Sequence, residues 1–175
     1  MTRPQARHVV ESGLKKMNRT LRVIGVILLM MVGAATVAIV TLSAKDWPQW
    51  RGAERLGLWT ETGILEEFPD GGLTVTWRVP INGGYSGPAV ADGRVFVLDY
   101  VETEARVMNG TERLLALSEE TGEVLWTHEW ATTYRMLMFT YATGPRATPT
   151  VDGDRVYVTG STGRIFCLDT ETGRV

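Results

Sequence analysis

Short apolar runs alternate with polar turns along most of the chain after residue 70. The clearest stretch is 113–126, in which apolar and polar positions alternate on both sides of a polar break at 119–122. Period-two alternation around a glycine-containing turn is typical of a β-hairpin with one buried face. The same pattern predicts further strands at 73–79, 88–90, 94–99, 149–151 and 155–158. We therefore expect an all-β fold from residue 71 to residue 175.

The strand pattern occurs twice. Residues 88–97 match residues 149–158 at a shift of 61, and residues 117–122 match residues 168–173 at a shift of 51. The difference of ten residues predicts an insertion at about 101–111, between the second and third strands of the first copy. Repetition at this spacing indicates a stacked architecture rather than two isolated hairpins.

The repeating unit closes on a tryptophan. Trp77 holds, one unit earlier, the place that Trp126 holds after the hairpin at 113–126. The polar insertion in the first copy is expected to carry Asn109-Gly110 at its tip, as a turn. Each unit is then four antiparallel strands, and such units in tandem are typical of the blades of a β-propeller.

The number of predicted strands is smaller than a closed ring needs. We count the last strand of one blade, one complete blade and three strands of another, whereas a ring takes about four to eight blades. Ending at Val175 would leave an unpaired strand edge and an uncovered sheet face. We therefore expect a partial propeller, the N-terminal part of a longer protein, in which the Trp77 strand completes the last blade.

The first 44 residues differ sharply in composition from the rest. Residues 1–22 carry six Lys or Arg residues against one acid, and residues 23–42 carry no charge. A helix of twenty residues spans about 30 Å, the thickness of the hydrocarbon core of a bilayer. We expect a cytoplasmic basic tail at 1–22. Residues 23–42 are either a transmembrane anchor or the apolar region of a signal peptide cleaved after Ala44.

Both alternatives place the remaining chain outside the cytoplasm. With an anchor, the domain lies at the bacterial inner membrane and faces the periplasm, and the membrane is a partner through the N-terminal helix. With a cleaved signal, the protein is secreted. The formal net charge of −2 argues against a nucleic-acid partner, which calls for a basic surface.

Residues 45–70 form an aromatic stretch with no helical or strand period. Its large rings lie among proline and glycine residues: Trp47, Trp50, Trp59 and Phe68. Burying each ring is worth a few kcal/mol. We therefore expect an extended arm that lies across the following domain, with an aromatic platform for sugar or lipid as the alternative.

Chemically reactive residues are few. The one cysteine, Cys167, excludes an internal disulfide and a multi-cysteine metal site. It lies in a strand pattern between Phe166 and Leu168, and we interpret it as a small buried core residue. The two histidines, His8 and His128, lie in different segments and do not form a catalytic pair. No catalytic residue is predicted.

Residues 116–126 resemble the repeat of the pyrroloquinoline-quinone (PQQ) propellers, written A-x-D-x-x-T-G-x-x-x-W. The matching residues of the first copy are Ala116, Thr121, Gly122 and Trp126, and those of the second are Asp169, Thr172 and Gly173. Ser118 stands where the pattern prefers aspartate. The resemblance covers about residues 46–175. It implies packing roles, with the Thr-Gly pair in the turn between the third and fourth strands and the tryptophan docked between blades.

The resemblance also implies two possible functions. Quinoprotein dehydrogenases hold PQQ and Ca²⁺ in the central channel, whereas other members, such as the BamB propeller of outer-membrane protein assembly, have no cofactor. The adjacent cysteine pair of the dehydrogenases is absent, since Cys167 is the one cysteine. We expect a non-catalytic binding or assembly scaffold. The alternatives are a PQQ- and Ca-dependent alcohol or sugar dehydrogenase, and a hydrolase or polysaccharide-binding propeller.

The two enlarged loops of the predicted blades lie on one face. In an antiparallel blade, the loop between the second and third strands, here 101–111, shares a face with the connection between blades, here 131–146. Binding residues usually collect in loops on one face of a rigid scaffold. We therefore expect a protein or small-molecule ligand there.

Arg146 is the candidate cofactor-binding residue on this face, at the entrance to an innermost strand and near the channel mouth. Tyr85 is its counterpart in the previous blade. A guanidinium can form a bidentate bridge with a carboxylate, and PQQ carries three carboxylates. The alternative for Arg146 is a structural bond to loop carbonyl groups.

Overall fold

The structure is a computed structural model, and it describes residues 44–104, 109–134 and 143–175. The described residues belong to one compact unit, Ala44–Val175. The predicted basic tail at 1–22 and the uncharged segment at 23–42 lie outside the described residues. Within the three described ranges, no helix is long and apolar enough to cross a membrane.

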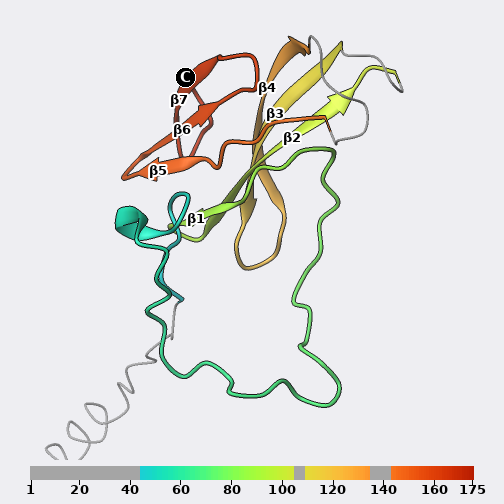
Figure 1. Cartoon of the computed structure of the whole chain (residues 1–175). Helices are drawn as coiled ribbons and strands as arrows, with labels where there is room; N and C mark the ends of the chain where they lie inside the picture. Colours follow the sequence, from blue (N-terminus) through green and yellow to red (C-terminus); the bar gives the residue numbers. More distant parts are fainter. Residues whose placement is uncertain (1–43, 105–108, 135–142) are drawn as a thin grey trace, which may run out of the picture. The chain divides into compact units, whose positions relative to one another are not determined.

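The described strands form two antiparallel sheets, as the alternation predicted (Figure 1). The first has the order β1-β2-β3-β4, built from β1 (Ala89–Ala91), β2 (Arg94–Glu102), β3 (Asn109–Ser118) and β4 (Val124–Thr133). The second has the order β5-β6-β7, built from β5 (Thr150–Asp152), β6 (Arg155–Thr159) and β7 (Ile165–Asp169). A single 3-10 turn, η1 (Ala53–Arg55), lies in the arm. The all-β prediction is confirmed for these residues, and each sheet has the strand order of a propeller blade.

The main core lies between the two sheets. The first sheet contributes Phe96, Leu98, Leu114 and Ala116, and the second contributes Val156, Val158 and Leu168, each at most 2% exposed. These residues occupy alternate positions of their strands, so one face of each sheet is apolar. Each such side chain contributes about 1.5–3 kcal/mol by leaving water, less for alanine.

Tryptophan docking joins the sheets through the Thr-Gly turns. The Trp126 indole nitrogen donates to the Thr170 carbonyl oxygen at 3.0 Å. Its ring lies against Gly173, where an added Cβ would come within 2.6 Å of it. Trp77 repeats the arrangement one blade earlier, because its indole nitrogen donates to the Glu119 carbonyl oxygen at 2.7 Å.

The aspartate of the repeat stabilises its own turn. Asp169 Oδ1 accepts hydrogen bonds from the Thr172 hydroxyl at 2.7 Å and from the backbone N–H groups of Thr172 and Glu171. The Thr172 bonds, the largest cause, hold the pKa of Asp169 below its ordinary value. Ser118 does the same more weakly in the first blade, where its hydroxyl oxygen accepts from the Thr121 N–H at 3.2 Å.

The strand predicted at 73–79 is not formed. Leu73 and Val75 are 59% and 60% exposed, and no strand of the described residues pairs with this segment. Alternation of apolar and polar residues favours a strand, but a strand forms only where a neighbouring strand accepts and donates its backbone hydrogen bonds. The segment is instead attached to the first sheet by the Trp77 indole, which donates to the Glu119 carbonyl oxygen, and beyond its end by the Asn82 N–H, which donates to Asp99.

The predicted turn at Asn109-Gly110 is also wrong. Both residues belong to β3, where Gly110 pairs with Glu102, so most of the predicted insertion is a longer β2–β3 hairpin. The physical reason is the buried ring of Tyr100. A Cβ at Gly110 would come within 2.5 Å of this ring, so glycine here allows close packing rather than a turn.

The arm contacts the first strand of both sheets. Trp47 and Val90 exchange two backbone hydrogen bonds, at 2.8 and 3.0 Å, and the Val151 N–H donates to the Pro48 carbonyl oxygen at 2.8 Å. The arm thus lies across the domain at these residues. The expectation of buried rings was wrong for the other aromatic residues, because Trp50, Trp59 and Phe68 are 68%, 74% and 75% exposed.

Candidate functional site

The two ends of each sheet carry different kinds of loop. The Glu119 N–H donates to the Gly93 carbonyl oxygen, and the Thr170 N–H donates to the Asp154 carbonyl oxygen, so the tight turns of each sheet meet at one end. The longer connections meet at the other end. We call this other end the connector face, formed by residues 82–86, 100–104, 109–113, 130–134 and 143–149.

Backbone hydrogen bonds join the two blade connections directly. The Tyr85 N–H donates to the Pro145 carbonyl oxygen at 2.8 Å, and the Ser86 hydroxyl donates to the Ala147 carbonyl oxygen at 2.9 Å. The first connection is also attached to its own blade, since the Tyr100 N–H donates to the Gly83 carbonyl oxygen at 2.8 Å. The connector face is therefore ordered by backbone groups together with the Ser86 hydroxyl.

A buried carboxylate anchors the first connection. Asp99 is fully buried and accepts a bidentate pair of bonds from Arg113 at 2.8 and 2.6 Å. It also accepts from the Asn82 backbone N–H at 2.8 Å and from the Asn82 side-chain amide at 3.1 Å. Burial alone would raise the pKa of Asp99. The bonds from Arg113 and Asn82, with the charge of Arg113, outweigh it and lower the pKa below its ordinary value.

A second buried carboxylate joins the two sheets. Glu112 accepts hydrogen bonds from the Trp130 indole nitrogen at 2.7 Å, the Tyr134 hydroxyl at 2.6 Å and the Ser161 backbone N–H at 2.9 Å. Gly160 makes room for it, because an added Cβ would lie 2.5 Å from Glu112 Oε2. Three donors on one carboxylate offset much of the cost of its burial.

Two tyrosines pack beside Glu112. The Tyr100 and Tyr134 rings lie 4.7 Å apart between centroids. Burial, followed by the hydrogen bond to Glu112, raises the pKa of Tyr134 far above its ordinary value. Burial, followed by the charges of Glu102 and Glu112, also raises the pKa of Tyr100. Both phenols are therefore protonated at neutral pH, and Tyr134 serves as a donor to the carboxylate.

The two predicted site residues meet on the surface of the connector face. The Arg146 guanidinium carbon lies 5.2 Å from the centroid of the Tyr85 ring, within the range of a cation–π contact. Arg146 also donates to the Gly144 carbonyl oxygen at 3.3 Å. Arg146 is exposed, and Tyr85 is 51% exposed. Of the predicted loops, residues 105–108 and 135–142 lie outside the described residues.

The fold and the repeat geometry agree with one protein family. A family model described as outer membrane protein assembly factor BamB, a PQQ-type repeat, matches residues 70–175. The chain belongs to this PQQ-like repeat family. No curated protein matches the chain.

The family includes members that hold PQQ with Ca²⁺, so the described residues can be tested against that group. Ca²⁺ takes six to eight oxygen ligands, yet the described ranges contain no group of three or more His, Cys, Asp or Glu residues placed to hold a metal. Asp99 and Glu112 are already engaged with protein donors. The outer edges of β1 and β5, which begin each blade of this PQQ-like protein, form backbone hydrogen bonds with Trp47 and Pro48. The described residues do not fit a PQQ–Ca²⁺ site.

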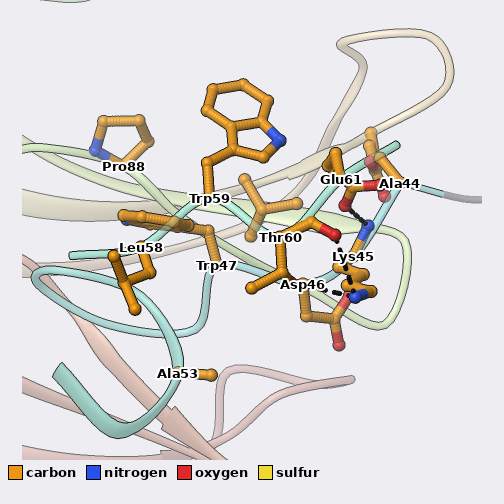
Figure 2. A pocket seen from close by; sticks show the side chains of 12 residues that line it. Ala44, Lys45, Asp46, Trp47, Ala53, Leu58, Trp59, Thr60, Glu61 and Pro88 are labelled. Atoms are coloured by element: carbon orange, nitrogen blue, oxygen red, sulfur yellow. Dashed lines mark hydrogen bonds between the residues drawn. The ribbon is translucent and has the colours of Figure 1, made fainter. Parts of the chain in front are cut away.

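The arm also forms a pocket, where the sequence indicated only an aromatic platform for sugar or lipid as an alternative to an arm with buried rings. Its volume is about 460 Å³, and it lies between the arm and β1 (Figure 2). The Trp47 and Trp59 rings form part of its wall, with centroids 6.4 Å apart and planes tilted by 45°. The available signal was the cluster of tryptophans with no strand period, which indicated an aromatic surface but not which rings would converge.

The buried carboxylates were missed, although the strand register could have found one of them. Asp99 and Arg113 are directly opposite in the β2–β3 ladder, and Glu112 is opposite Trp130 in the β3–β4 ladder. Opposed residues in a ladder lie close enough to interact. Pairing the predicted strands residue by residue would therefore have indicated the Asp99–Arg113 pair, whereas Glu112 and Trp130 lie beyond the ends of the predicted strands.

Proposed function

We propose that this chain is a membrane-anchored, extracytoplasmic PQQ-like propeller that acts as a non-catalytic binding or assembly scaffold. The uncharged segment at 23–42 with its basic flank supports the anchor and the location. The family model, whose description names an outer membrane assembly factor, supports an assembly role. The connector face is the proposed binding surface.

The observation that carries the proposal is that the buried acids at the connector face are bonded within the protein, whereas Arg146 is exposed on its surface. Two buried acids, Asp99 next to this face and Glu112 within it, accept hydrogen bonds from protein donors and hold the connections and sheets together. The exposed cation of this face, Arg146, rests on Tyr85 and on backbone that is fixed by hydrogen bonds. This arrangement suits recognition by a rigid surface better than it suits acid–base chemistry.

The proposed partner presents a carboxylate to Arg146. A guanidinium has five N–H donors in a planar fork, which matches a carboxylate in a bidentate pair. Stacking on Tyr85 orients the fork, so less rotamer entropy is lost when the partner binds. An aspartate, glutamate or chain terminus on a protein partner would supply the carboxylate.

Site-specific photo-crosslinking in the cells that make the protein tests this function. Tyr85 is replaced by p-benzoylphenylalanine, and the control position is Thr121, which is exposed at the opposite end of the blade. We expect one discrete crosslinked protein from position 85, its loss in Arg146→Ala and little or no product from position 121. Crosslinks that persist in Arg146→Ala, or that form equally from position 121, would contradict the proposed surface.

A second experiment separates the scaffold from a dehydrogenase. The full chain is incubated with PQQ and Ca²⁺, passed through gel filtration and assayed for reduction of a dye in the presence of alcohols or sugars. We expect the quinone absorbance to elute apart from the protein. Co-elution of the quinone together with alcohol-dependent dye reduction would overturn the non-catalytic function.

A further inference from the structure

The arm pocket is a second candidate site, separate from the connector face. Its volume of about 460 Å³ lies in the range of sites for small organic ligands. The apolar lining comes from both arm and sheet, and includes Trp47, Leu58, Trp59, Pro88 and Val90. Trp59 is 74% exposed, so a ligand that covers its ring removes apolar surface from water.

The walls of the pocket are held by specific contacts. The backbone of Trp47 is bonded to Val90 of β1 in both directions. Gly52 packs against the Trp47 ring at a φ of +72°, and an added Cβ would lie 2.8 Å from that ring. The Lys45 ammonium donates to the carbonyl and hydroxyl oxygens of Thr60 at 3.2 and 2.9 Å, which joins the two arm segments that face each other. The pocket is therefore largely formed without a ligand.

The two sides of the pocket differ in polarity. Figure 2 shows Trp47, Leu58, Trp59 and Pro88 on one side and Lys45, Asp46, Thr60 and Glu61 on the other. The charged lining residues are three acids, Asp46, Glu61 and Glu119, and one base, Lys45. Three carboxylates against one ammonium leave the lining with a net negative charge, although Glu61 also accepts a hydrogen bond from the Lys45 backbone N–H.

We propose that this pocket binds a small organic cation with an apolar body, of the alkylammonium or arylalkylammonium class. The apolar body packs against the tryptophans, Leu58 and Pro88. The ammonium group lies toward the carboxylates and within reach of an indole face, where a cation is attracted by the negative face of the ring. A neutral sugar would gain nothing from the net negative charge, and an anionic lipid headgroup would be repelled by it.

Isothermal titration calorimetry of the full chain in a nonionic detergent tests the proposal with three matched probes. The probes are 3-phenylpropylammonium, 3-phenylpropanol and 3-phenylpropanoate, which share one body and differ in charge. The variants are Trp59→Ala, which removes a pocket wall, and Glu119→Gln, which removes a lining charge. Trp50→Ala is the control, because Trp50 is 68% exposed and does not line the pocket.

We expect the ammonium probe to bind about tenfold more tightly than the alcohol, with the carboxylate weakest. Trp59→Ala should weaken the ammonium probe by about fivefold or more, and Trp50→Ala should leave its affinity unchanged. Glu119→Gln should reduce the preference for the ammonium over the alcohol. Equal binding of ammonium and alcohol, undiminished binding in Trp59→Ala, or no binding of the ammonium probe would each overturn the proposal.

Discussion

The Trp126 indole nitrogen lies 3.0 Å from the Thr170 carbonyl oxygen, on the turn of the neighbouring sheet. The same ring covers Gly173, whose φ of +67° is unfavourable for other residues. One tryptophan thus satisfies a carbonyl group and fills the space above a glycine. Trp77 and Gly122 form the same pair one blade earlier. The Thr-Gly turn of this repeat is therefore a docking site for the tryptophan that precedes it by one blade.

Alanine at Gly122 or Gly173 should destabilise the domain strongly. At both positions a Cβ meets an indole within 2.7 Å and the backbone has a positive φ, so the substitution adds overpacking to backbone strain. We expect each variant to lose about 2–4 kcal/mol of unfolding free energy, measured by urea denaturation.

Gly153→Ala is the matched control for these variants. Its φ is +56°, but no atom lies within 4 Å of an added Cβ. It should therefore report backbone strain alone, about 1 kcal/mol. If Gly153→Ala costs as much as Gly122→Ala, tryptophan docking does not contribute to the stability of the turn.

Asp99→Asn should destabilise the protein at neutral pH and have less effect in acid. The Arg113 and Asn82 donors face a carboxylate, and an asparagine amide would turn an N–H₂ group toward one of them. We expect a loss of about 2–3 kcal/mol at pH 7.

The pH dependence of this effect follows from the direction of the pKa shift. The pKa of Asp99 is lower in the folded than in the unfolded chain, so its contribution is complete above the ordinary value of 3.8. That contribution is lost as the pH falls from about 4 through the lowered folded pKa. Urea midpoints of wild type and Asp99→Asn should therefore converge toward pH 3. A constant difference between pH 7 and pH 3 would contradict this account.

Glu112→Gln should weaken the attachment between the two sheets. Glutamine keeps one acceptor oxygen for the three donors Trp130, Tyr134 and Ser161, so at least one buried donor loses its partner. We expect a loss of about 2–3 kcal/mol, and about 1 kcal/mol for Tyr134→Phe, which removes one donor. Faster amide hydrogen exchange at Ser161 in both variants would locate the effect at the junction.

The control for the Glu112 variants is Glu123→Gln. Glu123 is exposed at the β3–β4 turn, and its replacement should change the unfolding free energy by less than about 0.5 kcal/mol. Unchanged stability in Glu112→Gln would mean that water or a rearranged side chain replaces the lost acceptor.

Local pattern was enough to predict the sheets and the repeat. Alternation located β1 to β7, because apolar residues facing a neighbouring sheet recur every second position, but β4 ends at Thr133 and not at the predicted Trp126. It failed at 73–79, where the residues alternate equally well but no described strand lies beside them. It also failed at Asn109-Gly110, where a dipeptide typical of turns lies in β3 beneath a buried tyrosine. Both failures come from tertiary partners that a local pattern does not contain.

The candidate sites depended still more on tertiary structure. The repeat shift related Arg146 to Tyr85 as equivalent positions in two blades, but their mutual contact follows from how the connections pack. The arm pocket combines residues 44–61 with Pro88, Val90 and Glu119, and no periodicity links these segments. Composition indicated the aromatic residues of the arm, but the backbone bonds of Trp47 with Val90 and of Pro48 with Val151 fix where the arm lies.

Cys167 should react rapidly with thiol reagents in the folded protein. The interpretation of this residue as buried was wrong: Cys167 is exposed, while Leu168 beside it is fully buried. Phe166 and Leu168 face the first sheet, so Cys167, on the opposite face of β7, points away from that core. The rate of reaction with a disulfide reagent in native buffer should be within about tenfold of the rate in concentrated urea, since exposure controls access to the thiolate. Cys167→Ser should show no reaction, and protection of the native thiol by about a hundredfold or more would mean that this face of β7 is covered in solution.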